Sequence, residues 1–200
     1  MKIYGDRRSG NCYKLQLAAS LLGIDYQWVD VDILSGDTQA PAFAQLNPNR
    51  KIPVMELHDG RCLTESNAIL NYLAHGSALL PEDPYARALV EQWQFFEQYS
   101  HEPYIAVARF IAVYQGMPAE RAKEFRAKQA GGHKALAVME QQLARTPFLV
   151  GEQLSTADVA LYAYTHVAPE GGFELEQYPA IGAWLARIEA LPNFAAMDKV

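Results

Sequence analysis

The stretch 7-RRSGNCYK-14 decides how this chain begins, because it lies between a strand-like segment at residues 2–4 and a run of apolar residues with helical spacing. Ser9 and Cys12 are spaced like the two cysteines of a C-x-x-C redox motif. Serine, however, stands where that motif has its nucleophilic cysteine. The stretch therefore predicts the frame of a thiol site from which the reactive thiol is missing.

The composition is that of a folded protein with no membrane or nucleic-acid partner. Half of the 200 residues are hydrophobic and 20% are charged, which is enough for one large core or two small ones. No apolar run approaches the about 18–20 residues of a membrane span, and the N-terminus lacks a secretory signal, so we expect a cytoplasmic protein. The formal net charge of −6 argues against nucleic acid.

Cysteines and cations give two further expectations. Cys12 and Cys62 are far apart, and no Cys/His cluster has metal-ligand spacing, so neither a disulfide framework nor a metal site is indicated. If the cationic segments meet in space, they favour a small anion; otherwise they are solvated surface charge. These cations are Arg7, Arg8, Lys14, Arg50 and Lys51.

The first part of the chain alternates strand and helix signals. The expected strands lie at 2–4, 26–31, 52–57 and 62–64, and the expected helices at 12–22, 39–46 and 66–73. Asp59-Gly60 marks a hairpin between the last two strands. The order β-α-β-α-β-β-α is that of an α/β thioredoxin-like domain, which we place at residues 1–76.

Residues 77–83 read as a linker, and the rest of the chain, 84–200, predicts an all-α C-terminal helical domain. Helical runs are expected at about 84–114, 119–145, 155–168, 178–190 and 193–198, the second softened by Gly131-Gly132. Ser155 and Asp158 have the spacing of a capping box at the start of a buried helix. We assign this pair a structural role only.

Four motifs carried in this order resemble the cytosolic glutathione transferases over the whole chain. They are SGNCYK at 9–14, LNPNRKIPV at 46–54, TESNAI at 64–69 and GEQLSTADVALY at 151–162. The resemblance implies a glutathione-binding first domain and a helical domain that contributes the electrophile site. It further implies a detoxifying cytoplasmic homodimer that uses glutathione as co-substrate, without a metal, and conjugates it to small hydrophobic electrophiles.

The resemblance also implies a catalytic role for Ser9. In the serine-type branch, theta- and delta-like, a serine after the first strand donates a hydrogen bond to the sulfur of glutathione, and Ser9 matches that position. A hydrogen bond to a charged acceptor contributes about 1.5–3 kcal/mol and a helix N-terminus about 0.3–1 kcal/mol. Together they lower a thiol pKa by roughly one to three units. Asn11 is a second candidate donor, whereas Tyr4 lies one residue before the tyrosine position of other branches, where this chain has Gly5.

The other motifs predict how the rest of glutathione is held. The family has a cis peptide before the proline that matches Pro53, so that Ile52 pairs with the ligand like an added strand; an edge-strand proline is the alternative. At a helix N-terminus, Ser66 can bind the γ-glutamyl carboxylate and Glu65 its ammonium group, although the pair also suits an ordinary cap. Arg50 or Lys51 can supply a cation for the glycyl carboxylate.

For the electrophile, the resemblance points to the first helix of the second domain, where Tyr104 and Arg109 are the preferred residues. Two other functions compete with conjugation. One is a glutathione-dependent disulfide reductase or peroxidase, which needs the same thiolate. The other is a non-catalytic, transferase-like interaction module, against which the joint presence of Ser9, Lys51, Glu65 and Ser66 argues.

Overall fold

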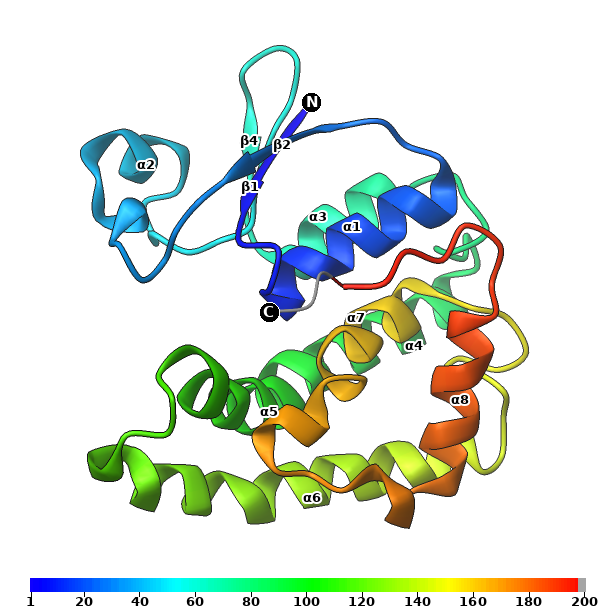
Figure 1. Ribbon diagram of the computed structural model, residues 1–200. Coiled ribbons are helices and arrows are strands. Elements are labelled where there is room, and N and C mark those ends of the chain that lie inside the picture. Colours follow the sequence, from blue (N-terminus) through cyan, green and yellow to red (C-terminus); the bar gives the residue numbers. More distant parts are fainter. Residues whose placement is uncertain (198–200) are drawn as a thin grey trace. The chain divides into compact units, whose positions relative to one another are not determined.

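The computed structural model describes residues 1–197 and divides them into two compact units (Figure 1). The first unit comprises residues 1–75 together with 192–197, and the second comprises residues 76–191. The first is a mixed α/β domain and the second is helical. Both expected fold classes, the thioredoxin-like domain and the all-helical domain, are confirmed.

The first unit is built on a four-stranded sheet in the order β2-β1-β3-β4. Strand β1 (Lys2–Gly5) pairs in parallel with β2 (Gln27–Asp30) and antiparallel with β3 (Val54–Glu56), which pairs antiparallel with β4 (Cys62–Leu63). The parallel pair needs a crossover, and helix α1 (Gly10–Leu22) provides it. The turn after β1 thereby places residue 9 at the N-terminus of α1.

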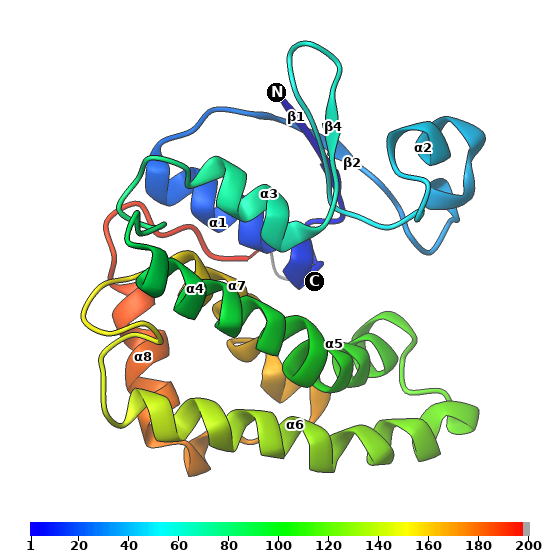
Figure 2. The same ribbon diagram turned by 180° about the vertical axis from the view of Figure 1, so that it is seen from behind.

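Helices cover both faces of this sheet. Figures 1 and 2 show α1 and α3 (Ser66–Leu73) side by side on one face and α2 (Pro41–Leu46) on the other. On the α2 face, Val31, Phe43 and Val54 form a buried cluster against which Tyr4 and Ile52 pack. Side chains of a strand alternate between faces, so Tyr4 lies on the α2 face and its neighbour Gly5 on the α1 face.

Residues 192–197 return to the first unit instead of forming the expected helix at 193–198. The Tyr13 hydroxyl donates to the Ala195 carbonyl at 2.7 Å, and the Ser20 hydroxyl donates to the Asn193 carbonyl at 2.7 Å. Asn193 has a left-handed φ of 62°, which interrupts a right-handed helix. The prediction was therefore wrong over 193–197, and residue 198 lies outside the described residues.

The second unit contains five α-helices within the described residues. They are α4 (Pro84–Phe96), α5 (Glu102–Arg109), α6 (Ala122–Leu143), α7 (Thr156–Thr165) and α8 (Pro179–Glu189). Two π-helical segments, Glu97–His101 and Phe110–Tyr114, join and extend α4 and α5, so the long run predicted for 84–114 is continuous but wound unevenly. Short 3-10 helices lie at Asp37–Gln39, Ala119–Arg121, Ala168–Gly171 and Leu175–Gln177. No helix among residues 1–197 is long and apolar enough to cross a membrane.

Helix α7 is buried along its whole length and begins at the predicted capping box. The Asp158 carboxylate accepts from the Ser155 N–H at 2.9 Å and from the Ser155 hydroxyl at 2.8 Å. It also accepts from the Leu149 N–H at 2.9 Å and the Trp184 indole N–H at 3.0 Å. Burial raises the pKa of the Asp158 carboxyl, and these hydrogen bonds oppose that rise. Asp158 thus fixes α7, the preceding loop and α8 together.

The glycine pair in α6 has a packing role. Helix α6 runs without a break through Gly131 and Gly132. A Cβ atom at Gly131 would lie 2.2 Å from the Tyr104 ring, and one at Gly132 would lie 2.2 Å from the Phe173 ring. The sequence suggested a softened helix, but the glycines allow two aromatic rings to lie directly on the helix backbone.

Candidate functional site

Ser9 is the N-cap residue of α1, with φ −76° and ψ 124°. Its carbonyl accepts from the Tyr13 N–H at 2.8 Å, whereas its side chain makes no capping hydrogen bond to the helix backbone. The half-buried hydroxyl therefore lies beside N–H groups that carry the positive end of the helix dipole. A negative charge that develops beside Ser9 would be stabilised by the hydroxyl and by the positive end of the helix dipole.

Cys12 lies under the β1 strand and is fully buried. Burial raises the pKa of its thiol to about 12, although a hydrogen bond with the Ser9 side chain acts in the opposite direction. A Cβ atom at Gly5 would lie 2.6 Å from the Cys12 sulfur and 3.0 Å from the Trp28 ring. The thiol is therefore a packing group, and the position beside it has room only for glycine.

A buried lysine ties this loop to the start of α3, which the sequence did not reveal. Lys14 has no solvent-exposed surface. Its Nζ donates to Asn11 Oδ1 at 2.8 Å and to the Ser66 hydroxyl at 3.1 Å, and that hydroxyl lies 3.1 Å from Asn11 Oδ1. The sequence offers one indication of this burial: its helical segment has no distinct polar face. In the structure, residues on nearly every side of α1 are buried. The sequence left Lys14 as either part of an anion site or a solvated surface charge, but its side chain is buried within the first unit.

The start of α3 contains Glu65 and Ser66. Glu65 is exposed, precedes the helix as its N-cap and has a φ of 64°, a strained value for a residue with a side chain. Ser66 is the first helical residue and is 6% exposed. The first N–H groups of α3 have no partner within the helix, so they can bind a carboxylate.

The loop before β3 contains the expected cis peptide bond, between Ile52 and Pro53. The main chain of Ile52 makes no hydrogen bond to any other of residues 1–197. Asn47 holds the loop from inside, where its amide donates to the Lys51 carbonyl at 2.7 Å. The Lys51 side chain is exposed, whereas the Arg50 guanidinium donates to Gln39 Oε1 at 3.1 Å and to the Gln39 carbonyl at 3.0 Å.

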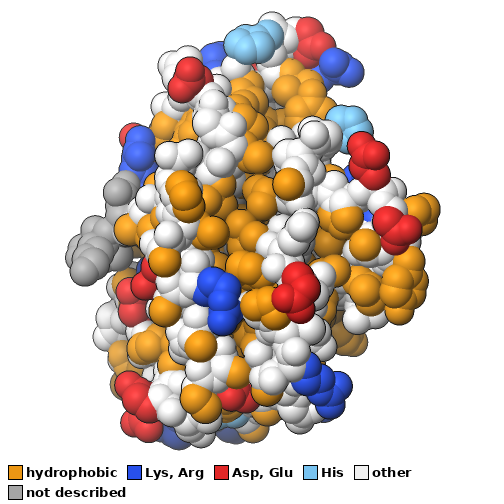
Figure 3. Space-filling model, turned by 90° about the vertical axis from the view of Figure 1, so that its right-hand side faces the viewer, with side chains coloured by type: hydrophobic (Ala, Val, Ile, Leu, Met, Phe, Trp, Pro, Cys, Tyr) orange, Lys and Arg blue, Asp and Glu red, His pale blue; other side chains and the backbone are white. Residues whose placement is uncertain are grey.

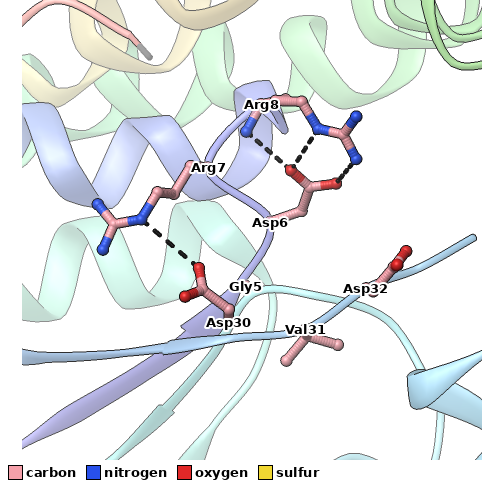
Figure 4. Close-up of a pocket in the computed structure, with 7 residues that line it drawn as sticks. All are labelled: Gly5, Asp6, Arg7, Arg8, Asp30, Val31 and Asp32. Atoms are coloured by element: carbon pink, nitrogen blue, oxygen red, sulfur yellow. Dashed lines mark hydrogen bonds and ion pairs between the residues drawn. The ribbon is translucent and has the colours of Figure 1, made fainter. Parts of the chain in front are cut away.

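The cations near the first loop do not gather into one anion site. A cavity of about 340 Å³ lies at the ends of β1 and β2 (Figure 4). There Arg8 pairs with Asp6 at 3.0 Å and Arg7 with Asp30 at 3.5 Å. With Lys14 buried and Arg50 bonded to Gln39, these cations have separate partners, which does not favour the anion site that the sequence left open. On the face in Figure 3, acidic and basic side chains are likewise interspersed.

The two residues expected to serve an electrophile lie on α5 in the second unit. Tyr104 is half-buried, and its ring lies on α6 with the Lys128 ammonium 5.7 Å from its centroid. Arg109 is 2% exposed, and its Nε donates to Glu170 at 2.6 Å. This ion pair joins α5 to the segment that follows α7.

Tyr4 is occupied elsewhere, in accord with its exclusion as the catalyst. Its hydroxyl donates to the Glu56 carboxylate at 2.5 Å, and this hydrogen bond raises the pKa of Tyr4. Lys2 reaches the same Glu56 oxygen at 3.3 Å. The three side chains form a group across β1 and β3, on the sheet.

The comparisons with known proteins agree with this fold. Residues 1–75 match the family described as glutathione S-transferase, N-terminal domain, and residues 94–192 match glutathione S-transferase, C-terminal domain. A glutathione S-transferase structure from Pseudomonas fluorescens is 63% identical, covers 98% of each chain and superposes with a TM-score of 0.97. The chain therefore belongs to the glutathione S-transferase family.

Two more distant relatives indicate the range of the family around it. A delta-class glutathione transferase structure from Nilaparvata lugens is 28% identical over 94% of this chain and 88% of that one, with a TM-score of 0.83. The disulfide-bond oxidoreductase YfcG of Escherichia coli is 30% identical over 91% of this chain and 87% of its own length. A protein named as a transferase and one named as a disulfide-bond oxidoreductase thus have similar sequence identities to this chain.

Proposed function

We propose that this enzyme conjugates the thiolate of glutathione to hydrophobic electrophiles and that Ser9 stabilises the thiolate. The observation that carries the proposal is the Ser9 hydroxyl at the N-terminus of α1, which the helix does not use as a cap. A serine in this position usually satisfies a helix N–H. Here the hydroxyl can donate to a ligand sulfur, and a thiolate is a stronger acceptor than the neutral Cys12 thiol.

The remaining parts of glutathione fit the other groups of the first unit. The main chain of Ile52, which precedes the cis Pro53 and makes no hydrogen bond within residues 1–197, suits the peptide part of the ligand. The N–H groups at the start of α3 suit the γ-glutamyl carboxylate, and exposed Glu65 suits its ammonium group. We propose that Lys51 binds the glycyl carboxylate. Arg50 is the second candidate, because its guanidinium is already hydrogen-bonded to Gln39.

In the second unit, we propose that Tyr104 contacts the electrophile. Arg109 stands second, because it would have to leave its ion pair with Glu170 to reach a ligand. We also propose, from the family resemblance, that the enzyme is a cytoplasmic homodimer. Light scattering on the purified protein tests the dimer directly.

A glutathione titration tests the main proposal. Wild type and Ser9→Ala are titrated by calorimetry, and the ultraviolet absorbance of the thiolate is followed at about pH 7. We expect both proteins to bind, and we expect only wild type to show the thiolate band. Ser20→Ala is the matched control, since Ser20 lies on the same helix and its hydroxyl serves the Asn193 carbonyl. Loss of the band in the control too would contradict the assignment to Ser9, and absence of binding by wild type would overturn the function.

One specific finding favours a second function. The likeness to the oxidoreductase YfcG makes glutathione-dependent disulfide reduction the alternative reaction. It needs the same thiolate but attacks a sulfur atom of a disulfide in place of a carbon electrophile. Turnover of a small disulfide is compared with turnover of an aryl halide by the same preparation. A faster reaction with the aryl halide supports conjugation, and the reverse supports disulfide reduction.

A further inference from the structure

Lys14 is a fully buried lysine that has no role in the conjugation reaction as proposed above. Placing an ammonium group out of water is costly unless other groups compensate for its lost hydration. Among its partners are two uncharged oxygens, Asn11 Oδ1 at 2.8 Å and Ser66 Oγ at 3.1 Å. Methionine would fill the same volume without that cost. This favours a role for Lys14 beyond packing.

Lys14 determines which way the Asn11 amide faces. An ammonium group has only donors, so the Asn11 atom beside it must be the carbonyl oxygen. The Ser66 hydroxyl accepts from Lys14, and its one proton then points to the same Asn11 oxygen. Two donors thus meet at Asn11 Oδ1, and a flipped amide would set its N–H groups against both of them.

The opposite end of the amide is the Nδ2 group. Asn11 is the second residue of α1, two positions after Ser9, and is half-buried, while Lys14 lies entirely inside the unit. With Oδ1 held on the buried side, Nδ2 faces away from it. Asn11 Nδ2 makes no hydrogen bond to any other of residues 1–197. A donor is therefore presented at the same helix N-terminus as the Ser9 hydroxyl.

We propose that Lys14 is a positioning residue that locks the Asn11 amide with Nδ2 toward the glutathione sulfur, so that Asn11 becomes a second donor to the thiolate beside Ser9. The inference rests on the proposed function. Through Ser66, the same lysine links the place of the thiol to the start of α3, where the γ-glutamyl group is proposed to bind. Lys14 acts through its neighbours and does not itself touch the sulfur.

The test is a cycle of variants in which the pKa of bound glutathione is measured from thiolate absorbance against pH. Lys14→Met and Asn11→Ala are each expected to raise that pKa by about one pH unit, the size of one hydrogen bond to a charged acceptor. The double variant is expected to show no larger rise than Asn11→Ala alone, because both changes remove the same donor. Lys2→Met, which removes a partly exposed lysine from the same unit, should leave the pKa unchanged.

Each outcome decides the inference. An unchanged pKa in Lys14→Met, with a thiolate present in wild type, overturns it and leaves the proposed function intact. Additive effects in the double variant also overturn it, because Lys14 would then act through its charge alone. Absence of thiolate in wild type overturns both. If Lys14→Met does not fold, Asn11→Ala decides: it removes the Nδ2 donor without adding a charge, and an unchanged pKa there overturns the inference.

Discussion

Helices α1 and α7 each have a serine as their N-cap residue, and the two serines are used in opposite ways. At the start of α7, Ser155 is 4% exposed and forms a complete capping box with Asp158. At the start of α1, Ser9 is half-buried, and its hydroxyl makes no capping bond. The polar groups at the start of α7 are satisfied within the fold, whereas the start of α1 is where we propose that the ligand sulfur binds. A helix N-terminus can thus stabilise either the fold or a bound anion, and the partners of its N-cap side chain indicate which.

The largest expected effect is on the alkylation rate of Cys12, in the first turn of α1. Because the pKa of Cys12 is raised to about 12, only about one molecule in ten thousand carries the thiolate at pH 8. We expect alkylation of native Cys12 to be slower than in the unfolded chain by about a thousandfold, measured by mass spectrometry after timed exposure to iodoacetamide. Half-exposed Cys62 is the internal control.

The same raised pKa has a consequence for stability. The folded thiol holds its proton at a pH where the unfolded thiol has lost it, so its contribution is intact below about pH 8.5 and falls as the pH rises toward 12. Denaturation of wild type and Cys12→Ala at pH 8 and pH 10 measures this. An equal loss in both proteins would mean that other groups cause the alkaline decline.

Asp158→Ala tests the satisfied helix end. It leaves four donors without their acceptor, and we expect it to lower the free energy of unfolding by about 3–5 kcal/mol. Asp83→Ala is the matched control, because Asp83 caps α4 at the surface with one hydrogen bond, to the Ala86 N–H. There we expect a loss of about 1 kcal/mol. Equal losses, measured by urea denaturation, would contradict the importance of burial.

Ser9→Ala tests the other end through catalysis. Loss of one hydrogen bond to the thiolate should lower kcat/KM for an aryl halide by about 10- to 100-fold at pH 7. The deficit should shrink above about pH 8.5, because glutathione then loses its proton without help. The pH profile of kcat/KM measures both effects, and a deficit that stays constant with pH would exclude a role in thiolate formation.

The smallest effect separates the two serines by stability alone. Ser155→Ala should cost about 1–2 kcal/mol, because a buried cap is lost. Ser9→Ala should cost less than about 0.5 kcal/mol, because no capping bond is removed. Urea denaturation of the two variants compares them directly, and a cost at Ser9 as large as that at Ser155 would show that Ser9 is a structural cap.

Local signals in the sequence predicted most of the framework. The helix at 66–73 was placed correctly, and the cis Ile52–Pro53 bond follows from the proline inside a strand together with the family motif. The capping box of α7 was read from the spacing of two residues. These features depend on residues that lie within a few positions of one another, so they can be predicted from the sequence alone.

Features that depend on distant partners could not be predicted. The burial of Lys14 depends on Ser66, and that of Arg109 depends on Glu170. Likewise, Gly131 was read as a weak point because nothing in the sequence places Tyr104 on top of it. The residues adjacent to a charged residue or a glycine do not indicate which distant side chain will contact it. That contact is known only once the fold is known.

The close contact between Gly5 and Cys12 limits how this site can change in evolution. A tyrosine at position 5, where other branches of the family place theirs, would bring its Cβ to 2.6 Å from the Cys12 sulfur and 3.0 Å from Trp28. A tyrosine therefore cannot be placed at position 5 by one substitution without moving Cys12 or Trp28. A smaller residue at position 12 would have to come first, so the order of the two mutations matters. The packing beneath β1 thereby keeps position 5 a glycine, beside the loop in which we propose that Ser9 acts.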